Sequence, residues 1–476
     1  MPQEWQPASK ERHLDASGYF SNRTIAALCS PTGGAICVLR ISGDRSREIA
    51  QRLTGRTLSS KDHRRAFRSW VVARDGHRLD DAVVLPFWAP HSFTGEDTVE
   101  LFLHGSPVIA QRVLDECFAG GARLALPGEF SFRAVKNGKM QLSQAEAVRD
   151  LISAEDDFSL DLALEKLSGS QQEWVAQVRA DLLQLCTLAE VGIDFSDQDV
   201  DEVSLPRLQA RLDDVIAALN RLHASFDRGA RFMEGVPVSI FGLPNAGKSS
   251  LFNAFLGEDR SIVSNLAGTT RDVVREKLHL KGPRGSVTLK VSDTAGLRAT
   301  GDQIEEIGIE RSLQSARDAD VVVVVIDGER PELRTLAPYL EMIQDKRRVW
   351  VCTKKDCLDP VDCQELDREI QQKFKGQPLW VSSKTLEGVE QAAFALAEQA
   401  GALLSRSPGE LILTRVEQVR AVEAALESLN RAKSATDHVL FATDIRHGMN
   451  DLGPLIGETV PDDVLGKIFS DFCIGK

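Results

Sequence analysis

Residues 242–250, GLPNAGKSS, carry the glycines, lysine and serine of the pattern G-x-x-x-x-G-K-[ST]. Glycines leave room for backbone N–H groups to surround phosphate oxygens, and the N-terminus of a following helix adds partial positive charge. Lys248 can then reach the β- and γ-phosphates, and Ser249 can ligate Mg²⁺. The stretch lies between the strand-like VSIF and the helix-like SLFNAFL, as such a loop requires. It therefore predicts a site for a nucleoside triphosphate.

Two motifs further along the chain can serve the metal and the γ-phosphate. GTTRD at 268–272 offers the hydroxyl of Thr270 as a second Mg²⁺ ligand when the γ-phosphate is present. DTAG at 293–296 ends a strand-like run, so that Asp293 can hold the metal's water shell while the N–H of Gly296 bonds the γ-phosphate.

Two more motifs can select the base. TKKD at 353–356 ends a strand-like run, and Asp356 can accept both the N1–H and the exocyclic amine of guanine. SSK at 382–384 closes the base pocket. The first of these motifs usually opens with Asn, and Thr353 stands there in this chain. A threonine can make some of the same hydrogen bonds between loops, so we expect guanine selection to survive. The motifs are weak singly, but in this order and on strand ends they predict a GTPase.

The residues that would drive hydrolysis depart from the Ras-like pattern. Leu297 occupies the position of the water-orienting glutamine, and an apolar side chain cannot orient water. Glu305 is a candidate for that role, the alternative being an ordinary solvated helix carboxylate. The side-chain oxygen of Asn245 could hold a monovalent cation against the phosphates, in place of the charge of an arginine finger.

The elements that must position these residues form three kinds of region in a chain of 476 residues. After an extension at 1–21, residues 22–140 mix β-type runs with one helical stretch around 106–118, which predicts an α+β domain. Apolar spacing of three and four predicts helices over 141–232 and again over 400–476. Between them, 233–399 alternates the apolar runs VPVSIFG, VTLKVSD, VVVVVID, RVWVCTKK and PLWVSS with helical segments, which indicates a parallel sheet inserted into a helical domain.

Composition limits the partners and the compartment. The net charge is −13, so a nucleic-acid partner would be met by a local patch or through a second protein. No apolar run approaches the length of a membrane span, and the first residues lack the apolar core of a signal peptide. The eight cysteines include no C-x-x-C pair, which favours neither a disulfide framework nor a zinc site and suggests the cytoplasm.

From about residue 22 onwards the chain resembles the tRNA wobble-uridine modification GTPases, the MnmE or TrmE family. The resemblance rests on GLPNAGKSSLFNA, AGTTRDVVRE, DTAGLR, FTGEDTVELFLHG, PGEFSFRAVKNGKMQLSQAEAVRDLI and the terminal FCIGK. It implies an N-terminal α+β domain that dimerises and binds folate, a helical domain, and an inserted Ras-like P-loop GTPase domain.

The resemblance also implies site residues. The contacts to 5-formyl- or methylene-tetrahydrofolate fall on Arg40, Glu100, Lys139 and Lys476. The K⁺ ligands fall on Asn245, Ser264, Leu266 and Thr269, and the catalytic glutamate falls on Glu305. The predicted contacts to GTP and its metals are Asn245, Ala246, Gly247, Lys248, Ser249, Ser250, Ser264, Asn265, Leu266, Ala267, Gly268, Thr269, Thr270, Asp293, Thr294, Ala295, Gly296, Thr353, Lys354, Lys355, Asp356, Ser382, Ser383 and Lys384.

The implied activity is shared with a partner. With the FAD- and NADH-using protein MnmG, in a heterotetramer-like complex, the family adds an aminomethyl or carboxymethylaminomethyl group to C5 of the wobble uridine in tRNA. Folate supplies the carbon, and GTP hydrolysis drives a conformational change. The alternative is a GTP-switched RNA-binding protein of ribosome assembly, which would share the nucleotide motifs but usually carries a KH-type G-x-x-G module that we do not find.

The terminal FSDFCIGK allows three interpretations. A prenylation box is disfavoured because it needs aliphatic residues after its cysteine, whereas Cys473 is followed by Ile474 and Gly475, with the charged Lys476 last. The end of a packed helix would explain Phe469 and Phe472, which lie three apart. The resemblance favours a catalytic thiol, with Lys476 promoting a thiolate at Cys473 that attacks the uracil ring or the one-carbon unit.

Overall fold

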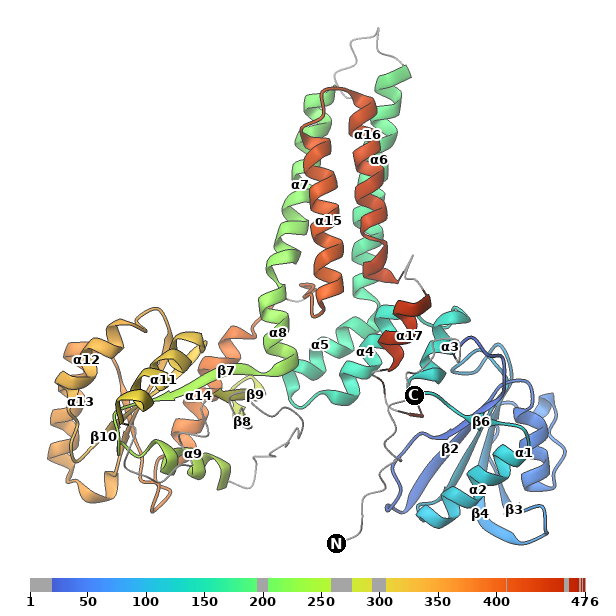
Figure 1. Cartoon of the computed structure of the whole chain (residues 1–476), viewed down its shortest axis with the longest axis horizontal. Coiled ribbons are helices and arrows are strands. Elements are labelled where there is room, and N and C mark those ends of the chain that lie inside the picture. The colour runs from blue at the N-terminus through green and yellow to red at the C-terminus, as the bar shows by residue number, and fades with distance from the viewer. Residues whose placement is uncertain are drawn as a thin grey trace. The chain divides into compact units, whose positions relative to one another are not determined.

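A computed structural model describes residues 19–194, 204–257, 276–292, 305–407, 409–457, 462–470, 472 and 474–475 (Figure 1). The chain forms two compact units. Unit 1 comprises Met1–Arg149 together with Gly453–Lys476, and unit 2 comprises Asp150–Leu452.

Unit 1 contains a six-stranded sheet of order β3-β4-β5-β2-β1-β6, antiparallel except for the β1–β6 pair. Its strands are β1 (Ile25–Leu28), β2 (Ile36–Ser42), β3 (Phe67–Val72), β4 (Arg78–Phe87), β5 (Thr98–His104) and β6 (Arg123–Leu124). Alternate residues of β2 and β5 are buried, so the sheet has one fully covered face. Helices α1 (Ser46–Thr54) and α2 (Pro107–Ala119) pack on that face.

The helix α2 was predicted, whereas α1 and α3 (Glu129–Lys136) were not. Helix α1 is only nine residues long, and its four buried residues lie at helical spacing within a largely polar segment. Helix α3 holds several buried residues, including charged ones, so its sequence gives little periodic contrast.

The C-terminal tail belongs to unit 1. Helix α17 (Asp462–Ser470) contacts α3, and Phe132 of α3 meets Phe469 at 5.6 Å between ring centroids. Phe469 in turn lies 5.0 Å from Phe472, and both are buried with Tyr19 and with Leu142 of α4 (Leu142–Ser153). The spacing of the two phenylalanines indicated a packed helix end, but the helical period of 400–476 gave no sign that this end packs on the N-terminal unit.

Unit 2 contains a second six-stranded sheet, of order β12-β11-β10-β7-β9-β8. Its strands are β7 (Val236–Phe241), β8 (Glu276–Gly282), β9 (Gly285–Ser292), β10 (Val321–Asp327), β11 (Arg347–Thr353) and β12 (Pro378–Trp380), all parallel except β8. Strand β8, EKLHLKG, was not among the predicted runs, which were almost continuously apolar, because it contains only two apolar side chains among polar ones.

Helices cover both faces of this sheet, which explains why its central strands are almost continuously apolar. On one face lie α9 (Lys248–Gly257) and α14 (Val389–Leu403). On the other lie α11 (Glu305–Asp318), α12 (Leu333–Glu341) and α13 (Pro360–Phe374). In β10 the first six residues are buried, and successive valines point into the two opposite cores.

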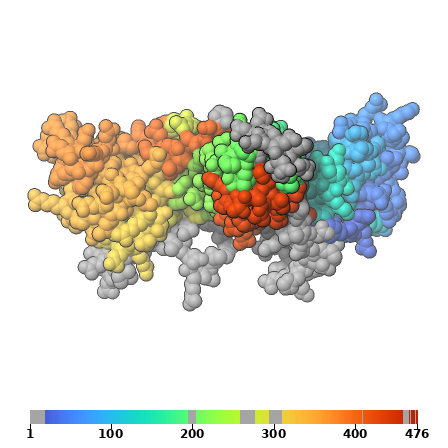
Figure 2. All heavy atoms as spheres, turned by 90° about the horizontal axis from the view of Figure 1, so that it is seen from above, coloured from blue at the N-terminus to red at the C-terminus, as the bar shows by residue number. Residues whose placement is uncertain are grey.

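The rest of unit 2 is helical. Its helices are α5 (Asp157–Ser168), α6 (Ser170–Asp194), α7 (Leu205–Ala224), α8 (Phe226–Glu234), α15 (Val416–Lys433) and α16 (His438–Asp451). Four of them, α6, α7, α15 and α16, pack as a bundle, and Figure 2 looks down on its end, where α7 and α15–α16 adjoin. Two bundle helices precede the β7–α14 module and two follow it, so the predicted insertion of an α/β module into a helical domain is confirmed. No described helix is long and apolar enough to cross a membrane.

Helix α5 of unit 2 holds the hairpin between β8 and β9. The Asp157 carboxylate oxygen Oδ2 accepts the backbone N–H of Ser286 at 2.6 Å and its hydroxyl at 2.9 Å. One residue earlier, Asp156 Oδ2 accepts the backbone N–H of Thr288 at 2.7 Å. The backbone bond from Ser286, followed by its hydroxyl bond, lowers the pKa of Asp157. The start of α5 is therefore joined directly to an edge of the parallel sheet.

Candidate functional site

The phosphate loop leaves the end of β7 and enters α9 at Lys248. A side chain at Gly242 would place its Cβ only 2.3 Å from the carbonyl oxygen of Val325, so only glycine lets the loop start this close to β10. Asn245 has a left-handed φ of 59°. The Lys248 Nζ donates to the carbonyl oxygens of Gly242 at 2.9 Å and Leu243 at 2.8 Å. Its ammonium thus already lies within the loop that would hold phosphates.

The end of β11 adjoins this loop. The Thr353 hydroxyl donates to the carbonyl of Ala246 at 2.8 Å and lies 3.3 Å from the carbonyl of Ile326 at the end of β10. Thr353 is buried, with 2% of its surface exposed. This residue makes the loop-bridging hydrogen bond that we expected of a threonine in place of asparagine.

The carboxylate of Asp356, which is predicted to select guanine, is held in place by a hydrogen bond. Ser382 follows β12, and its hydroxyl donates to Asp356 Oδ1 at 2.7 Å. That bond is the main cause that lowers the pKa of Asp356. Nearby, Lys354 Nζ pairs with Asp327 at 2.6 Å and with Glu329 at 3.1 Å, and these bonds raise the pKa of the lysine.

The structure therefore gathers one part of the predicted nucleotide site at the carboxyl ends of β7, β11 and β12. That part consists of Asn245, Ala246, Gly247, Lys248, Ser249, Ser250, Thr353, Lys354, Lys355, Asp356, Ser382, Ser383 and Lys384. Ligands of doubly wound sheets bind at this edge. Outside the described residues lie Ser264, Asn265, Leu266, Ala267, Gly268, Thr269, Thr270, Asp293, Thr294, Ala295 and Gly296. Glu305 is the first residue of α11, and its side chain is outside the described part as well.

A second cluster lies on the sheet of unit 1. Arg40 of β2 stands directly opposite Glu100 of β5, and its Nε and Nη2 lie 2.9 and 2.8 Å from Glu100 Oε1. The Arg40 guanidinium also lies 5.0 Å from the ring centroid of Phe93 and 5.3 Å from that of Phe130. Two residues predicted from the resemblance thus form one ion pair flanked by two aromatic rings.

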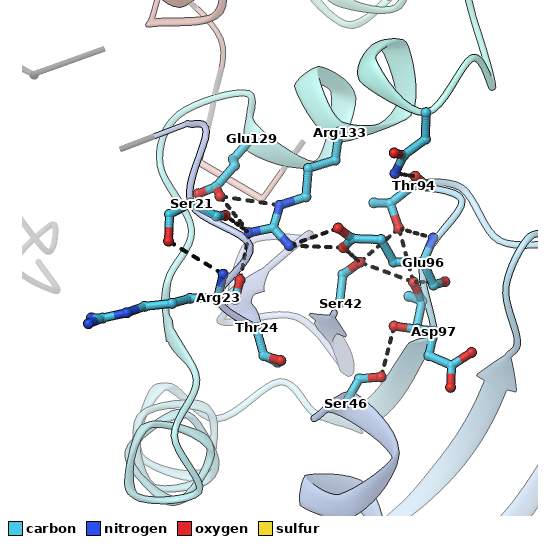
Figure 3. Close-up of polar contacts among 12 residues, drawn as sticks. Ser21, Arg23, Thr24, Ser42, Ser46, Thr94, Glu96, Asp97, Glu129 and Arg133 are labelled. Atoms are coloured by element: carbon cyan, nitrogen blue, oxygen red, sulfur yellow. Dashed lines mark hydrogen bonds and ion pairs between the residues drawn. The ribbon is translucent and has the colours of Figure 1, made fainter. Parts of the chain in front are cut away.

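A buried polar network holds the loop that carries Phe93 (Figure 3). The Arg133 guanidinium donates to Glu96 at 2.9 and 3.1 Å and to Glu129 at 2.8 Å, and it also donates to the backbone carbonyl of Arg23 at 2.7 Å. Figure 3 shows Arg133 lying between the two carboxylates. The Arg133 and Glu129 side chains are 3% and 0% exposed, so their charges are neutralised within the protein. No sequence pattern predicted this network, although FTGED and PGEFSFR contain its charged residues.

The remaining residues predicted to bind folate lie near this loop or outside the described part. Lys139 follows α3 and is exposed, and its Cγ and Cδ lie 3.2 and 3.3 Å from where a Cβ on Gly95 would stand. Gly475 of the tail has a φ of 99°, and a Cβ there would meet the carbonyl oxygen of Leu28 at 1.9 Å. Cys473 and Lys476 are outside the described residues. Gly475 thus lies against β1, whose neighbour β2 carries Arg40.

The fold and the first cluster define a P-loop protein of the guanine nucleotide-binding class. Two family models match, "MnmE helical domain" over residues 142–473 and "GTP-binding protein TrmE N-terminus" over residues 24–139. The chain belongs to the MnmE family of tRNA modification GTPases, and it is an enzyme that hydrolyses GTP in tRNA modification.

Relatives that match over nearly their whole length support the same family assignment. The chain is 40% identical to the tRNA modification GTPase MnmE of Azoarcus sp. (strain BH72), over 95% of this chain and 98% of the relative. It is 37% identical to that of Aquifex aeolicus (strain VF5) and 35% identical to that of Natranaerobius thermophilus, each time over 95% of this chain and 99% of the relative.

Proposed function

We propose that this chain is a K⁺-stimulated GTPase that acts with an FAD-dependent, MnmG-type partner on tRNA in the cytoplasm. Together they add an aminomethyl or carboxymethylaminomethyl group to C5 of the wobble uridine. The observation that carries the proposal is the union of two clusters in one chain. In unit 2, the phosphate loop and the Asp356 carboxylate lie at the carboxyl ends of parallel strands. In unit 1, the ion pair of Arg40 and Glu100 lies beside an aromatic ring on the other sheet. Membership of the tRNA modification GTPases favours this reading over a ribosome-assembly switch.

The second cluster supports a folate of the 5-formyl or methylene class. A pteridine ring is flat and carries both donors and acceptors, which suits a carboxylate such as Glu100, a guanidinium such as Arg40 and aromatic side chains such as Phe93. Lys139 and Lys476 would meet the acidic tail of the ligand. When bound, the folate supplies the one-carbon unit, and FAD enters only through the partner.

The tail supports a role for Cys473 next to this cluster. Gly475 contacts the end of β1, while Phe469 and Phe472 fix α17 on α3. We assign Cys473 as the nucleophile toward the uracil ring or the one-carbon unit, with Lys476 favouring its thiolate.

The nucleotide site supports Mg²⁺ and K⁺ as cofactors. Ser249, in the first turn of α9, has the hydroxyl that Mg²⁺ requires, with Thr270 as the second side-chain ligand. Asn245 stands at the left-handed position of the loop, where its amide oxygen can face a cation on the phosphates. Ser264, Leu266 and Thr269 would complete the K⁺ site, and Glu305 would orient the attacking water.

The open face of the unit 1 sheet supports a homodimer. The face opposite α1 and α2 exposes Ile36, Trp70 and Val83, with 62%, 46% and 42% of their surfaces accessible. An antiparallel sheet that leaves such apolar side chains uncovered fits a second copy of itself. The net charge of −13 is consistent with a partner that supplies much of the tRNA-binding surface.

The decisive experiment is mass analysis of wobble nucleosides in tRNA from cells that lack this protein and from cells carrying Cys473→Ser. Both should lose the modified nucleoside, while the purified variant keeps its GTPase rate. Normal modified tRNA in the deletion strain would refute the function. In parallel, GTPase rates are compared in K⁺ and in Na⁺ at equal ionic strength. Equal rates would refute the cation role of Asn245.

A further inference from the structure

Thr353, the first residue of TKKD, has a single hydroxyl proton to donate, and the structure shows which acceptor it bonds. Thr353 Oγ1 lies 2.8 Å from the carbonyl oxygen of Ala246 and 3.3 Å from that of Ile326. Both neighbours are acceptors, and a hydroxyl carries a single O–H. The proton therefore bonds the phosphate loop, and Thr353 keeps no donor for a bound base.

Packing holds the hydroxyl in this orientation. Thr353 is 2% exposed and Ala246 is also 2% exposed, so turning the hydroxyl away would leave a buried carbonyl without its partner. The Thr353 side chain also lies 3.2 to 3.3 Å from where a Cβ on Gly247 would stand, so it fits tightly against the loop. The residues on either side of Ala246, Asn245 and Gly247, both have positive φ. The hydroxyl therefore bonds the centre of the turn, in addition to the bonds that Lys248 makes to its first two residues.

The position of Thr353 indicates which side of the base it would face. Asp356 would take the N1–H and amine edge of guanine, and the loop at Ala246 would hold the phosphates. Thr353 ends β11, bonds the loop at Ala246 and precedes Asp356 by three residues, so we expect it to face the imidazole side of the purine, whose N7 is an acceptor. An asparagine there has two N–H donors, enough for both the loop carbonyl and N7, whereas a threonine has enough for the loop alone.

We propose that Thr353 is a positioning residue that shapes the phosphate loop and leaves guanine N7 without a hydrogen bond. Base selection in this chain then rests on Asp356 and the loop at 382–384, and guanine nucleotides bind more weakly than they would to an asparagine variant. The inference rests on the proposed assignment of the guanine site.

The test compares GDP with 7-deaza-GDP, which has a C–H in place of N7, by competition against a fluorescent GDP on the full chain. The wild type should bind the two with affinities equal within about twofold. Thr353→Asn should bind GDP about five- to tenfold more tightly than the wild type does, which is the effect of one added hydrogen bond. The same variant should bind 7-deaza-GDP more weakly than GDP by a similar factor. Thr353→Val should weaken both ligands equally, and Thr353→Ser should restore the wild-type affinities.

The ratio of the two affinities is unaffected by partial misfolding, because both ligands use the same folded fraction. A wild type that prefers GDP over 7-deaza-GDP by fivefold or more would overturn the inference. So would an asparagine variant that does not discriminate between them. Asp356→Ala tests the site itself: unchanged GDP affinity in that variant would refute the guanine-site assignment rather than the role of Thr353.

Discussion

Replacing Arg133 by Met should destabilise unit 1 strongly. The guanidinium is 3% exposed, and it neutralises Glu96 and a fully buried Glu129. Breaking a buried ion pair by removing one partner costs about 3 to 5 kcal/mol. The lower end applies here because Glu129 keeps Arg123 at 2.6 Å and Glu96 keeps the Ser42 hydroxyl at 2.8 Å.

A loss of about 3 kcal/mol corresponds to a fall of roughly 6 to 12 °C in the melting temperature of a domain of this size. Scanning calorimetry of the full chain measures this shift, and hydrogen exchange of peptides from α3 and β2 assigns the transition to unit 1. The matched control is Arg45→Met, which breaks an ion pair whose side chains are 50% and 65% exposed and should leave the transition in place.

A second variant tests whether charge, rather than lost packing, is the cause. Adding Glu96→Gln to Arg133→Met removes the carboxylate that lost its partner, so part of the melting temperature should return. If Arg133→Met melts no lower than Arg45→Met, the network does not hold unit 1, and the reasoning from buried charge fails.

Three other perturbations follow from the nucleotide module. Gly242→Ala should abolish GDP binding in calorimetric titration because its Cβ meets a strand carbonyl, whereas Gly257→Ala, with open space around it, should bind normally. Asp157→Ala removes the two bonds from Ser286 and keeps the bond from Thr288 to Asp156, so hydrogen exchange at the Ser286 end of the β8–β9 hairpin should accelerate about five- to tenfold. Unchanged exchange would show that the Asp157 carboxylate does not hold the hairpin. Asp356 has a lowered pKa, so the affinity for guanine nucleotides should fall only when the pH drops below the range in which an aspartate usually takes up a proton. In Ser382→Ala this fall in affinity should occur at a higher pH. Identical pH profiles of the variant and the wild type would contradict the role of Ser382.

The nucleotide module could be predicted in detail because its chemistry demands particular residues at contiguous spacing. A glycine-rich loop, a lysine and a strand-end carboxylate each have few substitutes, and the valines of β10 mark a strand buried on both faces. The hydroxyl bridge of Thr353 followed from its position in TKKD alone. The motifs GTTRD at 268–272 and DTAG at 293–296 lie outside the described residues and remain predictions.

The second cluster was harder to predict because its contacts join residues far apart in the chain. Arg40 and Glu100 meet only through the register of β2 and β5, which their sequences do not specify. Arg133 looks like a surface residue of a short helix, and it is buried because two carboxylates and two backbone carbonyls surround it. The resemblance named Arg40 and Glu100, but neither it nor the sequence pattern indicated Phe93, Phe130 or Arg133.

Because the C-terminal tail packs in unit 1, this unit can be completed only at the end of synthesis. Phe132 and Tyr19 emerge from the ribosome early, but Phe469 and Phe472 follow only after the whole of Asp150–Leu452. At ordinary rates of synthesis this interval lasts roughly fifteen seconds to a minute, during which the apolar cluster on α3 lacks its cover. A chain that stops within the GTPase module therefore lacks Phe469 and Phe472, so the apolar cluster on α3 gains its last members only after the nucleotide-binding module has been synthesised.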